Sequence, residues 1–129
     1  MTTALEVAYD AGVLIGADRG DLQIWQDHRV RLEQGILPLV PAPVVAQVSR
    51  SPKQHLLRRF LGGCKIVPFA AAEAHAVGAL AGAAGTADVV DAHLVAVAGA
   101  ARAVVLTADA RDLERLAEHL LPRPRVVPV

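Results

Sequence analysis

The sequence has little cysteine, few aromatic residues and no net charge, and each shortage excludes a class of function. The single cysteine, Cys64, can form neither an internal disulfide nor a thiolate zinc site, which predicts a reducing compartment, the cytoplasm. Aromatic residues make up 3% of the chain, too few for a base-stacking platform. The 13 basic and 13 acidic side chains cancel, so no overall field draws the protein to nucleic acid or to a membrane.

Long hydrophobic runs are also missing. The uncharged stretch that begins at Ala74 and continues just beyond Gly85 contains His75 and is shorter than the about 20 residues that cross a bilayer. Residues 1–6 show no basic region followed by an apolar run, so we expect no signal peptide. The chain has 129 residues, of which 53% are hydrophobic, and these values predict one soluble folded domain over residues 1–129.

Strand-like and helix-like segments alternate along the chain. Strands are predicted at 5–9, 36–40, 65–68, 103–106 and 126–129, and helices at 21–34, 43–48, 51–62, 70–84, 87–100 and 111–121. In the helix at 51–62, Ser51 is predicted as the N-cap and Pro52 as the first helical residue. Because the strands are apolar on both faces, the pattern predicts an α/β fold, a three-layer α/β/α sandwich with a central, mainly parallel sheet.

Two aspartates follow predicted strands. Asp10 comes directly after the first strand, and Asp109 follows the strand at 103–106 with Thr107 between them in sequence. Ligands of open parallel sheets bind beyond the carboxyl ends of the strands, so these carboxylates can converge on one edge. The alternatives are ordinary local roles, a turn for Asp10 and a helix N-cap for Asp109.

A second pair of aspartates shares one face of a predicted helix. Asp88 and Asp91 are three residues apart in a segment that is otherwise apolar nearly all round. No lysine or arginine lies between Lys65 and Arg102 to balance them. Either the pair caps the first turn of the helix, or a cation compensates its charge, and a divalent metal is a suitable partner for carboxylates.

The basic residues are concentrated in an acid-free segment. Between Gln34 and Ala72 there is no acidic residue, and the predicted helix there presents Lys53, Arg58 and Arg59. These side chains are candidate contacts for an RNA backbone. The alternative is an amphipathic helix with a solvated basic face.

Four segments in order resemble the motifs of PIN domains, and in particular the small VapC-type ribonuclease toxins of toxin–antitoxin pairs. The segments are Val7-Ala8-Tyr9-Asp10, Pro43-Val44-Val45-Ala46-Gln47-Val48, Asp88-Val89-Val90-Asp91-Ala92-His93-Leu94-Val95-Ala96 and Val105-Leu106-Thr107-Ala108-Asp109-Ala110-Arg111-Asp112. The resemblance covers essentially the whole chain. It implies a PIN-like fold, a homodimer, a Mg²⁺- or Mn²⁺-dependent endoribonuclease activity on an RNA substrate, and neutralisation by a VapB-like antitoxin protein.

The resemblance also implies roles for individual residues. Asp10, Asp91 and Asp109 match the catalytic, metal-binding acids, with Asp88 and Asp112 as supporting acids and Thr107 as a hydroxyl next to the metal. The position that usually carries a glutamate is Gln47, whose amide oxygen can accept a hydrogen bond or bind a metal but carries no charge.

Two other functions fit part of the pattern. A degenerate PIN domain would bind RNA or protein without cleaving, and the neutral Gln47 keeps that alternative open. A phosphoaspartate receiver domain also places acids at strand ends, but it would need a lysine after the last strands, and Lys53 and Lys65 both come too early.

Overall fold

Five parallel strands form the centre of the molecule, shown in a computed structural model that describes residues 6–129. The strands are β1 (Val7–Tyr9), β2 (Leu39–Pro41), β3 (Lys65–Val67), β4 (Val104–Thr107) and β5 (Val126–Pro128), in the order β3-β2-β1-β4-β5. Ala8 pairs with Leu39 on one side and with Val105 on the other. The predicted parallel sheet is therefore confirmed.

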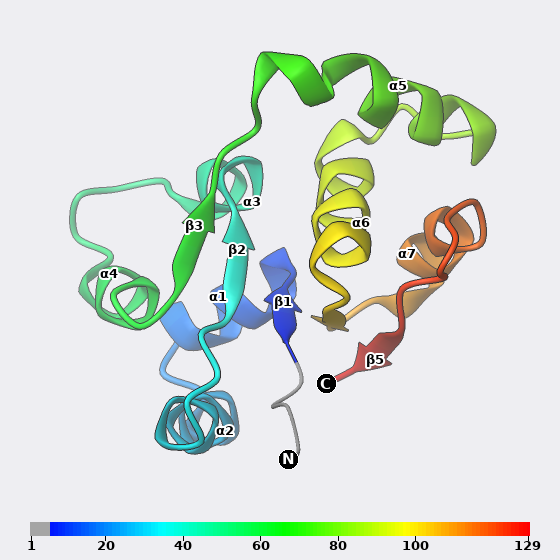
Figure 1. Cartoon of the computed structure of the whole chain (residues 1–129). Coiled ribbons are helices and arrows are strands. Elements are labelled where there is room, and N and C mark those ends of the chain that lie inside the picture. The colour runs from blue at the N-terminus through cyan, green and yellow to red at the C-terminus, as the bar shows by residue number, and fades with distance from the viewer. Residues whose placement is uncertain (1–5) are drawn as a thin grey trace.

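Helices cover both faces of this sheet (Figure 1). The elements are α1 (Ala11–Asp18), α2 (Leu22–Glu33), α3 (Ala42–Val48), α4 (His55–Leu61), the 3₁₀ turn η1 (Ala71–Glu73), α5 (Ala74–Ala83), α6 (Val89–Ala101) and α7 (Ala110–Ala117). The first four helices lie on one side of the sheet, and α5, α6 and α7 lie on the other. The architecture is the three-layer α/β/α sandwich that the sequence predicts.

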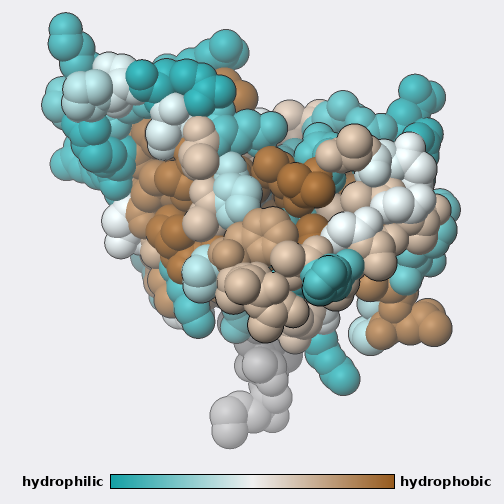
Figure 2. All heavy atoms as spheres, turned by 90° about the horizontal axis from the view of Figure 1, so that it is seen from above, coloured by the Kyte–Doolittle hydropathy of each residue, from teal (hydrophilic) through white to brown (hydrophobic). Residues whose placement is uncertain are grey.

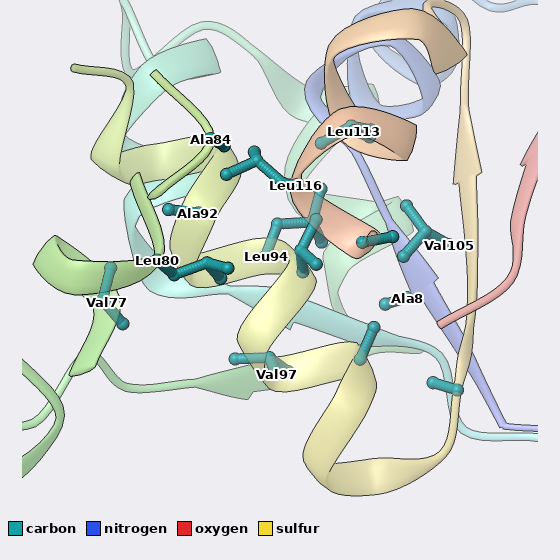
Figure 3. Close-up of a cluster of buried hydrophobic side chains, with 14 of the residues drawn as sticks. Ala8, Val77, Leu80, Ala84, Ala92, Leu94, Val97, Val105, Leu113 and Leu116 are labelled. Carbon is teal, nitrogen blue, oxygen red and sulfur yellow. The ribbon is translucent and has the colours of Figure 1, made fainter. Parts of the chain in front are cut away.

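Two apolar clusters hold these layers together, one on each face of the sheet. On one face, Leu14, Val44 and Phe60 pack against Tyr9 and Val40 of the strands. On the other face, side chains of α5, α6 and α7 meet Ala8 and Val105, as the close-up in Figure 3 shows. The inner strands β1, β2 and β4 are buried on both sides and need no polar alternation, which explains their apolar segments, whereas the edge strands β3 and β5 are more exposed.

The predicted element boundaries need three corrections. The sequence predicts no helix after Asp10, yet α1 begins there, although Gly12 and Gly16 are poor helix formers. The predicted helix at 51–62 begins only at His55, because the Gln54 side chain accepts hydrogen bonds from the backbone N–H groups of Arg50 and Ser51 and holds them in a turn. The predicted helix at 111–121 ends at Ala117.

Other predicted boundaries differ by a few residues. The strand predicted at 36–40 is found at Leu39–Pro41. The strand predicted to start at Leu5 is described from Val7, and Leu5 itself lies outside the described residues. Within residues 6–129, no helix combines the length and the apolar character that crossing a membrane requires.

The order of the strands defines where a ligand can bind. From β1 the chain moves outward through β2 and β3, whereas β4 and β5 lie on the opposite side of β1. The connections therefore diverge between the carboxyl ends of β1 and β4, which is the usual place for a ligand in open α/β sheets. Asp10 follows β1, and Asp109 follows β4, at this same switch point.

Candidate functional site

Asp10 is the N-cap of α1, and hydrogen bonds hold both of its carboxylate oxygens. Oδ1 accepts from the Ala11 backbone N–H at 2.7 Å, and Oδ2 accepts from the Thr107 hydroxyl at 2.6 Å. The Asp10 backbone N–H donates to the Leu106 carbonyl at 3.0 Å, which joins the ends of β1 and β4. Locally, Asp10 is therefore a helix cap and not the turn residue that the sequence offers as the alternative. Its side chain also reaches the end of β4 through Thr107.

Thr107 connects two of the predicted metal ligands. Its side chain is completely buried, and its hydroxyl oxygen accepts from the Asp109 backbone N–H at 2.9 Å while donating to Asp10. One hydroxyl therefore satisfies the backbone after β4 and orients the carboxylate after β1. The structure places Thr107 beside the acids, where the resemblance expects it.

Asp88 and Asp91 lie at the start of α6. Asp88 is the N-cap, and its Oδ1 accepts from the Asp91 backbone N–H at 3.0 Å. Asp88 is exposed, whereas Asp91 is half-buried in the first turn. The predicted cap is therefore correct for Asp88, but it uses only the backbone of Asp91 and leaves the Asp91 carboxylate facing other acids.

The charges around Asp91 are unbalanced. Burial raises the pKa of Asp91 to about 7, and the negative charges of Asp88, Asp10 and Asp112 contribute to this increase. Within residues 6–129, no lysine or arginine nitrogen lies within 4.0 Å of these four carboxylates. The acid that follows β1 and those of α6 and α7 thus repel one another at this edge. Among them, the half-buried carboxyl of Asp91 takes up a proton most readily.

A small hollow opens beside Asp91. It has a volume of about 130 Å³, and Asp88, Asp91 and Asp112 line it together with Arg115 of α7. Arg115 is a residue that the sequence analysis missed, although its position three residues after Asp112 places the two on one helix face.

Gly12 is a second residue that the sequence analysis missed. A Cβ atom at this position would lie 2.6 Å from the Cβ of Ala108, so only glycine lets α1 approach the segment after β4. That approach brings Asp10 to Thr107. A close contact between distant segments leaves no local signal in the sequence.

Two predicted ligands are less closely connected to this group. Asp109 is exposed, its carboxylate caps α7 by accepting from the Arg111 N–H at 3.4 Å, and only its backbone contacts Thr107. Gln47 is exposed on α3. In the described residues 6–129, no three His, Cys, Asp or Glu side chains stand ready in positions that would hold one metal ion.

The chemistry of the donors nevertheless fits a hard divalent cation. Mg²⁺ and Mn²⁺ prefer carboxylate oxygens, and Mg²⁺ keeps several waters, so one or two carboxylates are enough to bind it. Asp10 and Asp91 offer such oxygens, and the repulsion from Asp88, Asp10 and Asp112, which adds to the effect of burial on the pKa of Asp91, is the condition that a cation relieves. Asp109 would join by a side-chain rotation, because its backbone already lies at Thr107.

The predicted RNA contacts lie on another element. Lys53 comes just before α4, and Arg58 and Arg59 lie on it, all three with exposed side chains. Leu57 and Phe60 attach this helix to the sheet. Arg58 also donates to the Pro52 carbonyl and lies 3.3 Å from His55 Nδ1, so part of its hydrogen-bonding capacity is used locally.

Comparisons with known proteins show what the chain resembles in three dimensions. No family model matches the sequence, and no curated protein matches it. VapBC2 from Rickettsia felis, solved bound to a DNA fragment from its promoter, superposes with a TM-score of 0.73 at 16% identity, over 97% of this chain and 99% of that one. PAE2754 from Pyrobaculum aerophilum superposes with a TM-score of 0.63 at 17% identity, over 87% of this chain and 79% of that one.

These similarities define the fold class. The chain has a PIN-like α/β/α fold, and the resemblance to VapC-like PIN domains that the sequence motifs indicate is confirmed at the level of the fold.

Proposed function

We propose that the protein is a Mg²⁺- or Mn²⁺-dependent endoribonuclease of the VapC type that acts in the cytoplasm. The observation that carries this proposal is the group of carboxylates at the switch point of the sheet, where burial, together with the negative charges of Asp88, Asp10 and Asp112, raises the pKa of Asp91 to about 7. Acids from three separate elements repel one another there, and hydrolysis of a phosphodiester by bound metal ions needs such a group.

Each acid has a separate task in this proposal. Asp10, Asp91 and Asp109 would hold the metal, and Asp88 and Asp112 would add negative charge around it. Thr107 keeps the Asp10 carboxylate turned toward the carboxyl edge of β4. A bound Mg²⁺ or Mn²⁺ supplies an activated water and stabilises the leaving oxygen. Gln47 would leave the site one negative charge short of the usual pattern.

The same proposal includes partners. The structural similarity to VapBC2 supports a VapB-like antitoxin. A hollow of about 640 Å³ supports it as well, and its lining includes Val13, Ile24 and Val127. An apolar segment of the antitoxin would fill this hollow, which lies beside Gly12 and therefore close to Asp10. A homodimer is proposed from the sequence resemblance alone.

The alternative is a PIN-like domain that binds RNA without cleaving it. Two observations favour it, the neutral Gln47 and the exposed, outward position of the Asp109 carboxylate. The experiment that separates the two is incubation of a structured RNA with the wild-type chain and with Asp10→Asn, with Mg²⁺ or with EDTA. The proposal predicts cleavage by the wild type with Mg²⁺ only. Binding without cleavage under every condition would favour the alternative.

A further inference from the structure

A third hollow lies at the opposite edge of the sheet, away from the acids. Its volume is about 340 Å³, and it is formed by the end of α6, the start of β4 and residues 122–125. Three arginines line it, Arg102 from the end of α6 and Arg123 and Arg125 from the segment before β5. Two segments far apart in the sequence thus bring their positive charges to one place.

These positive charges are poorly balanced. None of the residues that line the hollow is acidic. Among residues 6–129, the only carboxylate within 4.0 Å of the three guanidinium groups is that of Glu118, which lies 3.9 Å from Arg123. More than half of each side chain in this pair is exposed (55% and 57%), so the pair is weak.

The backbone of Arg102 provides a second observation. Its φ and ψ are 53° and 40°, and it is the one residue other than glycine with a positive φ in the described part of the chain. Gly20, Gly35 and Gly85 occupy the other such positions. This conformation is unfavourable for a residue with a Cβ atom, so glycine is the residue expected at this helix end.

The simplest explanation of Arg102 is electrostatic, because a cation stabilises the carboxyl end of a helix. That explanation does not extend to Arg123 and Arg125, which lie outside any helix and still line the same hollow. Three arginines that line one hollow with no acidic residue in its lining match the chemistry of a phosphate, which arginine binds through two parallel N–H···O bonds.

We propose that this hollow binds a phosphate group, with Arg102, Arg123 and Arg125 as the donors. The phosphate comes either from a free phosphate or mononucleotide or from the backbone of a nucleic-acid strand. In the second case the hollow is a contact for the RNA substrate, remote from the acids that repel it, and this extension rests on the proposed function. The hollow lies at the start of β4 and the acids lie at its end, and the strand is about 10 Å long at 3.3 Å per residue.

The test is an NMR titration without divalent metal. Inorganic phosphate is added first, and a short single-stranded oligoribonucleotide is added to a second sample. We expect saturable shifts of the Gly99, Arg102 and Arg125 amide signals. Shifts with inorganic phosphate identify a site for small phosphates, and shifts with the oligoribonucleotide alone identify a site for a nucleic-acid backbone. If neither probe gives saturable shifts there, the proposal is wrong.

Variants separate binding from a structural role. Arg102→Gly removes the guanidinium and suits the backbone, so we expect an unchanged or higher melting temperature together with at least fivefold weaker binding. Arg123→Gln/Arg125→Gln should weaken binding as much or more, whereas the charge-matched control Arg19→Gln/Arg29→Gln should not. If all of these variants bound the phosphate probe as tightly as the wild type, the proposal would be overturned.

The proposed nuclease function can fail without affecting this result. Asp10→Asn removes a proposed metal ligand at the far edge of the sheet, and it should show the same phosphate-induced shifts as the wild type. Loss of these shifts in Asp10→Asn would contradict an independent site.

Discussion

At the scale of single residues, Thr107 connects the strand ends to the acids. Its buried hydroxyl donates to Asp10 and accepts from the Asp109 N–H. Thr107→Val keeps the shape but leaves both partners without their bond, and it should lower the free energy of unfolding by about 1–3 kcal/mol. Urea denaturation measures this change. Thr107→Ser keeps the hydroxyl and is the matched control. A valine variant as stable as the serine variant would show that the hydroxyl has no such role.

Asp91 gives the protein a specific dependence on pH. Its pKa is raised from the ordinary value of 3.8 to about 7 in the folded state, so between these two pH values the folded state holds a proton that the unfolded state has lost. The stability from this proton is complete below the unfolded pKa and is lost as pH rises through about 7. Without metal, the wild type should therefore lose stability relative to Asp91→Asn between pH 5 and pH 8, on the order of a few degrees in melting temperature.

Melting curves of both proteins at several pH values in EDTA measure this difference. Mg²⁺ should reduce the pH dependence of the wild type, because the cation takes the place of the proton. A difference between the two proteins that is the same at every pH would contradict the assigned pKa.

At the scale of elements, the contact between α1 and the segment after β4 determines the site. A Cβ on Gly12 would lie 2.6 Å from the Ala108 Cβ, so Gly12→Ala should push the two apart and weaken the Asp10–Thr107 bond. We expect lower stability and weaker metal binding, measured by melting and by calorimetric titration with Mn²⁺. Gly78→Ala in α5 meets nothing within 4 Å and should instead stabilise the protein by about 0.5–1 kcal/mol. Equal effects of the two substitutions would contradict this role for Gly12.

The element α4 tests the predicted RNA contacts. Reversing the charges of Lys53, Arg58 and Arg59 to glutamate should weaken RNA binding and reduce the slope of log K against log salt by roughly 0.7 per lost contact. The matched control reverses Arg19, Arg29 and Lys65 instead. Fluorescence anisotropy in a salt series gives both slopes. If the charge-reversed variant and the control gave identical slopes, Lys53, Arg58 and Arg59 would be solvated residues with no RNA contact.

The elements also show how far the sequence predicts the structure. The apolar strand segments predict the strands to within a few residues, because this signal is local. α1 could not be predicted, since its glycines lower helix propensity and its stability comes from packing Val13 and Leu14 against the sheet. The start of α4 depends on the Gln54 side chain, whose hydrogen bonds to the 50–51 backbone outweigh the Ser-Pro cap signal.

At the scale of the whole molecule, strand order is what brings the acids together. β1 and β4 are neighbours although 97 residues separate Asp10 from Thr107. The sequence predicts that Asp10 and Asp109 lie at one edge of the sheet, because both follow strands of a parallel sheet. It could not predict that the Asp109 carboxylate is exposed while the Asp109 backbone N–H is hydrogen-bonded to Thr107. Nor could it predict that Arg115 lines the hollow beside Asp91, since side-chain directions depend on packing.

The outer surface of the molecule fits a protein with partners. Figure 2 shows hydrophobic surface in the middle of the face seen from above, with hydrophilic side chains gathered toward its margins. Large apolar side chains that stay exposed include Ile66, Phe69 and Val89.

The central claim is that the acids at the switch point hold a divalent metal, and anomalous scattering from crystals soaked in Mn²⁺ tests it most directly. We expect a peak at about 2.0–2.3 Å from carboxylate oxygens of Asp10 and Asp91, with Asp109 turned toward it, and no peak there in Asp91→Asn crystals. The account would be contradicted if wild-type crystals showed no Mn²⁺ peak at this edge after soaking at a Mn²⁺ concentration at which the chain cleaves RNA.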